Sequence, residues 1–238
     1  MSARVALVDL KSFSKKGIVS DFTRFYKTAP GEYGEGDLFL GLSVPQTRSI
    51  AKKHHNLELG EIEKLFNSPF HEARLCAAII LNLQFKAAKK TQDRKKIFDF
   101  YLKQVRAERV NNWDIVDVSA PWMGVYLTEV EDPMPLLIKL SKSKSLWQRR
   151  VSIILTFALI RDGDLEPTII ISKALLNDDQ DLIHKAAGWM LRELGKKDVM
   201  LLRQFLTDHS HQMPRTMLRY SIEKLPERER KKWLVESK

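Results

Sequence analysis

The sequence has little of several residue types, and each shortage excludes a class of protein. A single cysteine, Cys76, cannot form an internal disulfide, so the chain fits a reducing compartment. Glycine and proline number only 10 and 9, and they stand mainly at breaks between helical stretches. No run of about 18 apolar residues occurs, so no transmembrane helix is expected. The N-terminal stretch MSARVALVDLKSFSKKG has no apolar run of signal-peptide length, and we expect a cytoplasmic protein.

Motifs for metal or nucleotide chemistry are also missing. The histidines show no metal-ligand spacing beyond His209 and His211, so no metal site is expected. The glycine-rich stretch GEYGEGD, residues 31–37, lacks the following Lys-Ser/Thr of a phosphate-binding loop and indicates an ordinary polar loop. Cys76 lies among Leu75, Ala77 and Ala78, which predicts a buried thiol and not a nucleophile.

Positive charge is what the chain has in excess. Lys and Arg total 40 against 30 Asp and Glu, which gives a net charge of +10. Such a surplus attracts polyanions, nucleic acids among them. The alternative is a soluble protein with an evenly charged surface. Whether the cations gather on one face of the molecule decides between these two readings. Apolar residues make up 44% of the chain, enough for a full-sized core and too many for a disordered chain.

The apolar residues recur at helical spacing. Positions 75, 78, 79 and 82 share one helix face, and so do positions 151, 154, 155 and 158. The best strand-like run, residues 168–171, continues helically through Leu176. The pattern predicts about a dozen helices and no sheet, an all-α fold.

An internal repeat appears when the helices are paired. Four stretches, which begin at Leu65, Leu140, Leu175 and Phe205, each end one helix, turn through polar residues and start another. A basic residue stands near the start of each second helix, and Trp113 fills the missing slot; the basic residues are Arg74, Arg150, Lys185 and Arg215. A helical pair that repeats every 30 to 40 residues, roughly, is typical of a HEAT-like α-solenoid. We therefore expect one domain over residues 1–238.

Equivalent positions of successive solenoid repeats fall in a row. The four basic residues would then line one concave basic face, close to helix N-termini that already favour anions. Further cations follow at Arg192 and Arg219. A stripe of this kind matches the phosphates of a duplex. The alternative is that the stripe has no such function, because the helices of any basic solenoid carry residues of this kind.

Two helical stretches carry an aromatic ring beside a charge. Trp113 and Asp117 are four residues apart and share one helix face, as do Lys185 and Trp189, with Arg192 three residues further. Exposed tryptophan is costly unless something stacks on it, and a carboxylate among phosphate contacts suggests a role facing positive charge. The residues alone leave another reading open, in which the tryptophans are core and Asp117 is a cap or an ion-pair partner.

Four motifs together resemble the AlkD-like DNA alkylation repair family, which consists of HEAT-like-repeat DNA glycosylases. They are DLFLGLSVPQTR (37–48), NNWDIVDVSAPW (111–122), SLWQRRVSII (145–154) and HKAAGWMLREL (184–194), in order over most of the chain. The resemblance implies excision of N3- and N7-alkylated purines from double-stranded DNA with no metal and no cofactor. We expect a monomer, cytoplasmic or nucleoid-associated if bacterial.

Residue by residue, the resemblance assigns the catalytic carboxylate to Asp117 and the sugar contacts to Trp113 and Trp189. It places the accompanying arginine at Arg150, with Arg149 as the alternative register. Asn112 stands where the family pattern Trp-Trp-Asp-x-x-Asp has its first Trp, a departure expected to alter packing or lesion choice more than catalysis. The predicted DNA contacts are Arg74, Arg149, Lys185, Arg192, Arg215 and Arg219.

The mechanism implied by this assignment follows from the leaving group. An N3- or N7-alkylated purine is cationic, so it leaves as a neutral base while positive charge develops on the deoxyribose. Asp117 would stabilise that charge and Arg150 would hold a phosphate. Asp114 is predicted to face away from Asp117. The alternative function is a non-catalytic HEAT-repeat protein that recognises damaged or branched DNA.

Overall fold

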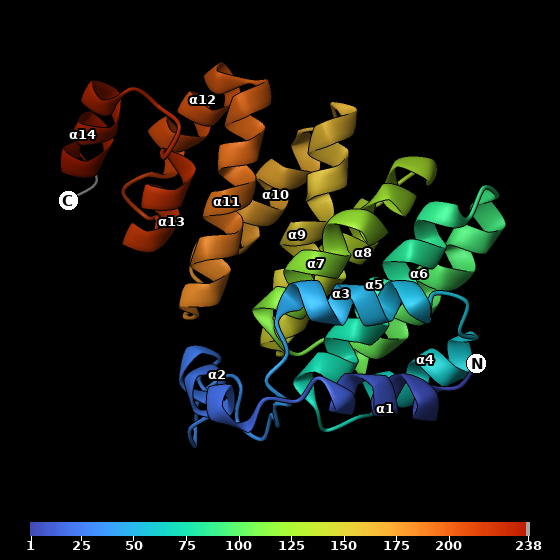
Figure 1. Cartoon of the computed structure of the whole chain (residues 1–238). Helices are drawn as coiled ribbons and strands as arrows, with labels where there is room; N and C mark the ends of the chain where they lie inside the picture. The colour runs from blue at the N-terminus through green and yellow to red at the C-terminus, as the bar shows by residue number, and fades with distance from the viewer. Residues whose placement is uncertain (237–238) are drawn as a thin grey trace. The chain divides into compact units, whose positions relative to one another are not determined.

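A computed structural model describes residues 1–236, and the regular elements within them are helices joined by loops, with one isolated bridge between Leu38 and Phe70 and no strand (Figure 1). The all-α prediction is confirmed. The structure divides into two compact units, Met1–Met123 and a second that begins at Gly124. No described helix combines the length and the apolar character that crossing a membrane requires.

The first unit is built around one long buried helix. Its elements are α1 (Ala3–Ser12), η1 (Lys16–Ile18), α2 (Val19–Phe25), α3 (Val44–Lys53), α4 (Leu59–Phe66), α5 (His71–Ala87), α6 (Thr91–Arg106) and α7 (Trp113–Met123). Helix α5 is buried over most of its length and packs against α3, α4, α6 and α7. Cys76 lies in this core, where burial raises the pKa of the thiol to about 12. The prediction of a buried cysteine is confirmed.

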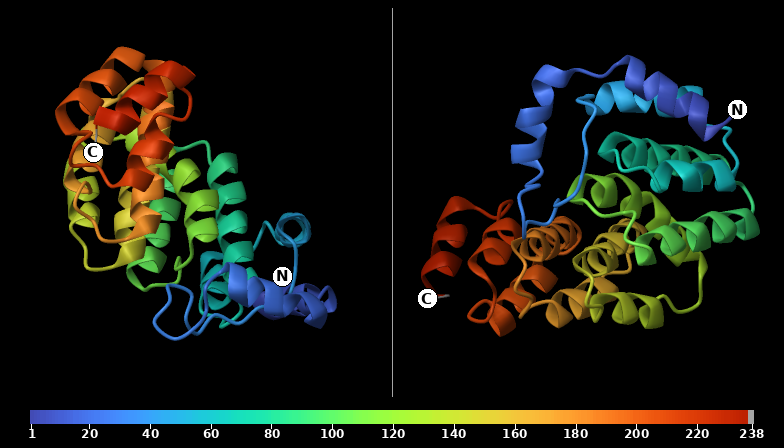
Figure 2. Two further views of the ribbon diagram at one scale, coloured as in Figure 1. Left: turned by 90° about the vertical axis from the view of Figure 1, so that its left-hand side faces the viewer. Right: turned by 90° about the horizontal axis from the view of Figure 1, so that it is seen from below.

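The second unit stacks successive helical pairs (Figure 2). Its elements are η2 (Gly124–Glu129), α8 (Met134–Ser141), α9 (Leu146–Asp162), α10 (Glu166–Ala174), α11 (Asp181–Lys197), α12 (Val199–His209), α13 (Arg215–Ser221) and α14 (Glu227–Glu236). Helix α9 packs against α8, α10 and α11, and α11 packs in turn against α13. Close approach of α11 to α13 depends on Gly188, because a Cβ there would lie 2.5 Å from the Met217 carbonyl oxygen.

Hydrogen bonds show which residues of α5, α9 and α11 occupy equivalent positions, and they correct the alignment expected from the sequence. Arg74, Arg149 and His184 are each the fourth residue of their helix, α5, α9 and α11. The side chain of each donates to the carbonyl oxygen six residues earlier, that of Ser68, Ser143 and Asp178 respectively. Arg150 and Lys185 stand one position later and are not equivalent to Arg74. The alignment expected from the sequence paired residues of like charge, whereas the equivalent residues are those at the same distance from the start of each helix.

Candidate active site and DNA-binding residues

Helix α7 starts at the first candidate residue. The Asn112 side-chain oxygen accepts a hydrogen bond from the Trp113 backbone N–H (2.9 Å), and the Asn112 carbonyl accepts from Val116 N–H. Asn112 is fully buried, and its amide nitrogen donates to the Asp37 carboxylate at 3.4 Å. Trp113 and Asp117 are half-buried and one helical turn apart on α7. The predicted shared face is confirmed.

A cluster of rings surrounds Trp113. Its ring stacks on Tyr26 (centroids 5.7 Å, interplanar angle 21°) and meets the Phe25 edge (5.6 Å, 72°). Tyr26 also stacks on Phe39 at 5.1 Å. Tyr26 and Phe25 come from the end of α2, a segment that the sequence analysis did not single out. The spacing of Phe22, Phe25 and Tyr26 at i, i+3 and i+4 is the signal that could have indicated it.

Beneath the rings, Asp114 joins a buried chain of hydrogen bonds. Its Oδ2 atom accepts from the Tyr26 hydroxyl (3.1 Å) and from His71 Nε2 (2.9 Å). The other ring nitrogen of His71 faces Asp37 at 3.4 Å. Burial acts to lower the pKa of His71, but the Asp114 charge and hydrogen bonds to Asp114 and Asp37 outweigh it and raise the pKa to about 9. Asp114 stands three residues before Asp117, so the two residues lie on neighbouring parts of the α7 surface and not on opposite faces, and the Asp114 carboxylate points into this network.

Arg74 belongs to the same network, which contradicts its predicted role as a DNA contact. It is only 4% exposed. Its guanidinium donates to Asp37 at 2.5 Å and to the Asn111 side chain at 3.0 Å. Burial alone would raise the pKa of Asp37, yet the hydrogen bond from His71 and the Arg74 charge hold it below its usual range. Arg74 therefore neutralises a buried carboxylate and orders the segment before α7.

Glu72 holds the loop that carries Phe39 and precedes α3. Its buried carboxylate accepts from the backbone N–H groups of Leu40, Gly41 and Leu42 at 2.8 to 3.2 Å. Gly41 has φ +83, and a Cβ there would meet the Lys15 carbonyl at 2.5 Å, so only glycine fits. The loop is thereby fixed by the α5 residue that follows His71.

In the second unit, α11 presents Lys185 and Trp189. The Lys185 ammonium pairs with Asp181 at 2.8 Å, and its side chain is 41% exposed. Trp189 is half-buried, and its ring lies 6.1 Å from that of Phe157. The pair lies on one helix face, as predicted.

Two other predicted contacts in this unit, on α9, have structural partners instead. Arg150 is 4% exposed and donates to the Leu182 carbonyl, so the prediction of an exposed phosphate clamp is wrong. Arg149 binds the Asp178 carboxylate with two nitrogens, at 2.5 and 3.2 Å. Both guanidiniums fasten α9 to the start of α11.

The remaining predicted contacts lie nearer the C-terminus. Arg192 is ion-paired with Glu223 and close to Glu193. Arg215 and Arg219 are exposed, and Arg215 also donates to the Leu234 carbonyl at 2.7 Å. Lys185, Arg215 and Arg219 are thus the predicted cations with accessible side chains.

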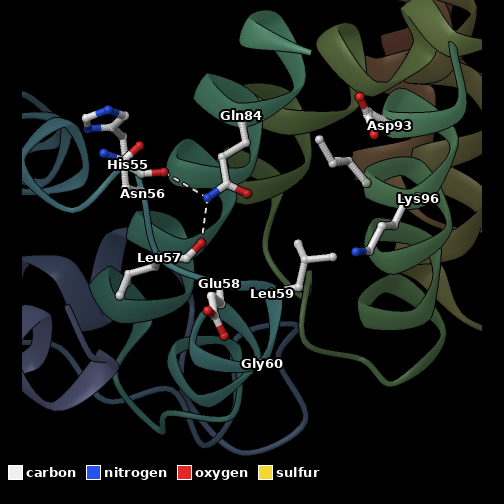
Figure 3. A pocket seen from close by; sticks show the side chains of 10 residues that line it. His55, Asn56, Leu57, Glu58, Leu59, Gly60, Gln84, Asp93 and Lys96 are labelled. Atoms are coloured by element: carbon white, nitrogen blue, oxygen red, sulfur yellow. Dashed lines mark hydrogen bonds between the residues drawn. The ribbon is translucent and has the colours of Figure 1, made fainter. Parts of the chain in front are cut away.

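A polar hollow of 710 Å³ lies elsewhere in the first unit and contains none of the predicted site residues (Figure 3). One wall is set by Gln84, whose amide donates to the carbonyls of His55 and Leu57 at 2.8 and 2.6 Å. Asp93 and Lys96 stand opposite on α6. Over residues 1–236, no group of three or more His, Cys, Asp or Glu side chains is arranged to hold a metal ion.

Comparison with known proteins decides the family. A model of the DNA alkylation repair enzyme family matches residues 6–225. The chain belongs to the DNA alkylation repair enzyme family. A solved structure described as a predicted DNA alkylation repair enzyme from Enterococcus faecalis is similar in fold, with a TM-score of 0.68 and 16% identity over 90% of this chain and 97% of that one. No curated protein matches the sequence.

Membership in the DNA alkylation repair enzyme family confirms the resemblance drawn from the four motifs. The fold is likewise confirmed, since the solved structure is similar in fold over 90% of this chain. The family name points to DNA, and a net charge of +10 favours binding to such a polyanion.

Proposed function

We propose that the protein is a DNA glycosylase that excises cationic N3- and N7-alkylated purines from double-stranded DNA. The observation that carries the proposal is Asp117, a half-buried carboxylate one turn after Trp113 in a chain of net charge +10. A carboxylate weakens phosphate binding, so its place on the Trp113 face of α7 suits a positively charged partner. Family membership supports DNA as the substrate.

The chemistry asked of Asp117 is electrostatic. The C1′–N bond breaks with its electron pair going to the base, which leaves neutral because it was cationic. Water then adds its oxygen to C1′, and Asp117 accepts the released proton. A carboxylate about 4 Å from the cationic sugar, at an effective dielectric near 20, contributes roughly 4 kcal/mol, about a thousandfold in rate.

The other residues would bind and orient the substrate. The Trp113 ring would pack against the sugar and add cation–π attraction to its developing charge. The ring is held for this by its stack on Tyr26, whose hydroxyl is fixed by Asp114. In the second unit, Trp189 is a further proposed sugar contact, and Lys185, Arg215 and Arg219 are proposed phosphate contacts.

Single-turnover release of 7-methylguanine and 3-methyladenine from methylated duplex DNA, followed by chromatography, tests the proposal. Asp117→Asn should lower the rate by two to three powers of ten, roughly, without weakening DNA binding. The matched control is Asp99→Asn, an exposed carboxylate on α6 that pairs with Lys95. Asp114→Asn is no control because it breaks the buried network.

Two results would overturn the proposal in different ways. Equal rates for Asp117→Asn and the parent would remove Asp117 from catalysis. Absence of base release by the parent, with steeply salt-dependent DNA binding, would favour the non-catalytic protein that recognises damaged or branched DNA.

A further inference from the structure

Helix α7 carries a second tryptophan, Trp122, to which the proposed function gives no role. Positions 114, 118 and 122 form one row along the helix and positions 113, 117 and 121 form the adjoining row, and none of these six residues is buried. Trp122 is 37% exposed and lies about 7.5 Å beyond Asp117 along the helix axis, at 1.5 Å per residue. The open face of α7 thus continues from the candidate catalytic carboxylate to an exposed aromatic ring.

Trp122 supports the side chain of Lys86, which comes from the end of α5. The Lys86 ammonium lies 3.3 Å from the centroid of the Trp122 ring, a close cation–π contact. One turn earlier on both helices, the Asn82 amide donates to the Val118 carbonyl at 2.7 Å, which fixes α5 beside α7. The ring holds the ammonium in place without neutralising it, so little side-chain entropy remains to be lost when an anion binds.

A second cation stands close to Lys86. Burial and, after it, the charge of the exposed Arg48 on α3 lower the pKa of the Lys86 ammonium. Residues 38–57 and 73–92, which include all of α3, most of α5 and the turn after it, contain no Asp or Glu. Among residues 1–236, neither Arg48 nor Lys86 forms an ion pair with a carboxylate, whereas Lys185 is paired with Asp181. Two uncompensated charges beside a ring favour the binding of an anion.

The place of this cation pair on the molecule suits one kind of anion. Asp117 is proposed to face the sugar of the damaged nucleotide. Phosphates of one strand follow each other about every 3.4 Å along a duplex axis, so the step of about 7.5 Å along α7 corresponds to about two nucleotides. A strand that places a sugar at Asp117 and follows the open face of α7 would bring a phosphate to Lys86. An acidic protein segment would match the two charges but not this spacing.

We propose that Lys86 and Arg48 bind one backbone phosphate of the damaged strand, within about three nucleotides of the lesion, with Trp122 as the support that holds Lys86. The inference rests on the proposed function, since the position of the phosphate is counted from the sugar at Asp117. It gives the damaged strand a path along the open face of α7. The contact is independent of base sequence, because every nucleotide carries the same phosphate.

The salt dependence of binding to an undamaged duplex tests the cation pair without any lesion. Lys86→Gln and Arg48→Gln should each weaken affinity about threefold to tenfold and reduce the salt slope by about one unit. The matched control is Lys103→Gln on α6, which removes the same charge from a lysine that Glu63 already pairs at 2.7 Å. Salt slopes of both variants equal to those of the parent and the control would overturn the inference.

Neutral phosphate analogues locate the contact relative to the lesion. The duplexes carry a tetrahydrofuran abasic site, which has a sugar but no base to release, and one uncharged methylphosphonate linkage at successive positions on either side of it. We expect one linkage, within about three nucleotides of the abasic site, to weaken binding by the parent about threefold to tenfold. Lys86→Gln should lose this sensitivity and Lys103→Gln should keep it. A parent that is insensitive at every linkage, or a Lys86→Gln variant with the same sensitivity as the parent, would contradict the assignment.

A double-mutant cycle tests Trp122 as the support of Lys86. Trp122→Leu removes the ring and should weaken duplex binding about twofold to fivefold, the scale of an exposed cation–π contact, whereas Trp122→Phe keeps a ring and should bind nearly as the parent does. In the Lys86→Gln background, Trp122→Leu should have no further effect. Thermal unfolding checks that each variant is folded. An undiminished effect of Trp122→Leu in that background would mean that the ring does not act through Lys86.

These measurements separate the phosphate contact from the proposed function. A parent that releases no alkylated base, but shows the reduced salt slope of Lys86→Gln and the position-dependent methylphosphonate effect, would refute the glycosylase and keep the contact. Base release by the parent, together with unchanged DNA affinity and salt slope for Lys86→Gln and Arg48→Gln, would refute the contact and keep the glycosylase.

Discussion

Helices α7 and α11 each carry a tryptophan and a charged residue one turn apart, with opposite charge and opposite order. On α7, Trp113 comes first and the carboxylate of Asp117 follows; on α11, the ammonium of Lys185 precedes Trp189. The start of α7 is fixed by buried ion pairs and stacked rings, whereas Lys185 is tied to Asp181 in a solvent-exposed pair. In the proposed function, the rigid position of Asp117 suits transition-state stabilisation, and the solvated position of Lys185 suits contact with a flexible phosphate backbone.

The largest expected difference between the two regions is in stability. Arg74→Ala leaves Asp37 buried without its guanidinium partner and should lower the free energy of unfolding by about 3–5 kcal/mol. Lys185→Ala removes an exposed pair and should cost less than about 1 kcal/mol. Urea denaturation of both variants measures the difference. Similar losses would mean that the buried network does not hold the α7 start more firmly.

The pH dependence of unfolding sharpens the same contrast. The pKa of His71 is raised in the folded state from 6.5 to about 9, so its stabilising contribution is fully present below pH 6.5 and is lost as pH rises through 9. The loss amounts to about 3 kcal/mol at most, since one pKa unit is about 1.4 kcal/mol. His71→Gln should flatten this part of the unfolding profile. A parent profile that does not fall between pH 7 and 9 would contradict the buried imidazolium.

Two glycines should respond with opposite signs. Gly188→Ala in the second unit forces a Cβ against the Met217 carbonyl and the Tyr220 Cβ, and should destabilise by about 1–3 kcal/mol. Gly60→Ala in the first unit has open space and lies within α4, so it should stabilise by about 0.5–1 kcal/mol. Thermal unfolding of both variants checks the signs. Tolerance of alanine at position 188 would show that α11 and α13 can separate without cost.

DNA binding is expected to show the smallest effect. Lys185→Ala should weaken affinity for duplex DNA by about 1 kcal/mol and reduce the salt slope by about one unit. Arg150→Ala, by contrast, should lower stability more than the salt slope, because its guanidinium faces the Leu182 carbonyl. Affinity measured at several salt concentrations separates these outcomes. A larger slope change for Arg150→Ala would restore it as a phosphate contact.

Local patterns predicted most of the fold. The β-branched run at 168–171 lies in α10, as its helical continuation indicated, because Thr168, Ile171 and Ser172 are buried at i, i+3 and i+4. The shared face of Trp113 and Asp117 followed from the same periodicity.

The buried network could not be predicted from such patterns. Tyr26, Asp37 and His71 come together with Asp114 across 34 to 88 residues, and no local spacing links them. Arg74 and Arg150 were misassigned because a buried arginine and a surface arginine look alike in a sequence. Their partners, Asp37 and the Leu182 carbonyl, are revealed only by the fold.

Single-turnover base release at saturating protein, measured for Asp117→Asn and Lys185→Ala on the same methylated duplex, tests the contrast between α7 and α11 most directly. We predict that Asp117→Asn lowers the rate constant by about two to three powers of ten with undiminished DNA affinity, while Lys185→Ala lowers affinity and leaves the rate constant within about twofold of the parent. Equal rate constants for Asp117→Asn and the parent, or a larger loss of rate for Lys185→Ala, would contradict the account.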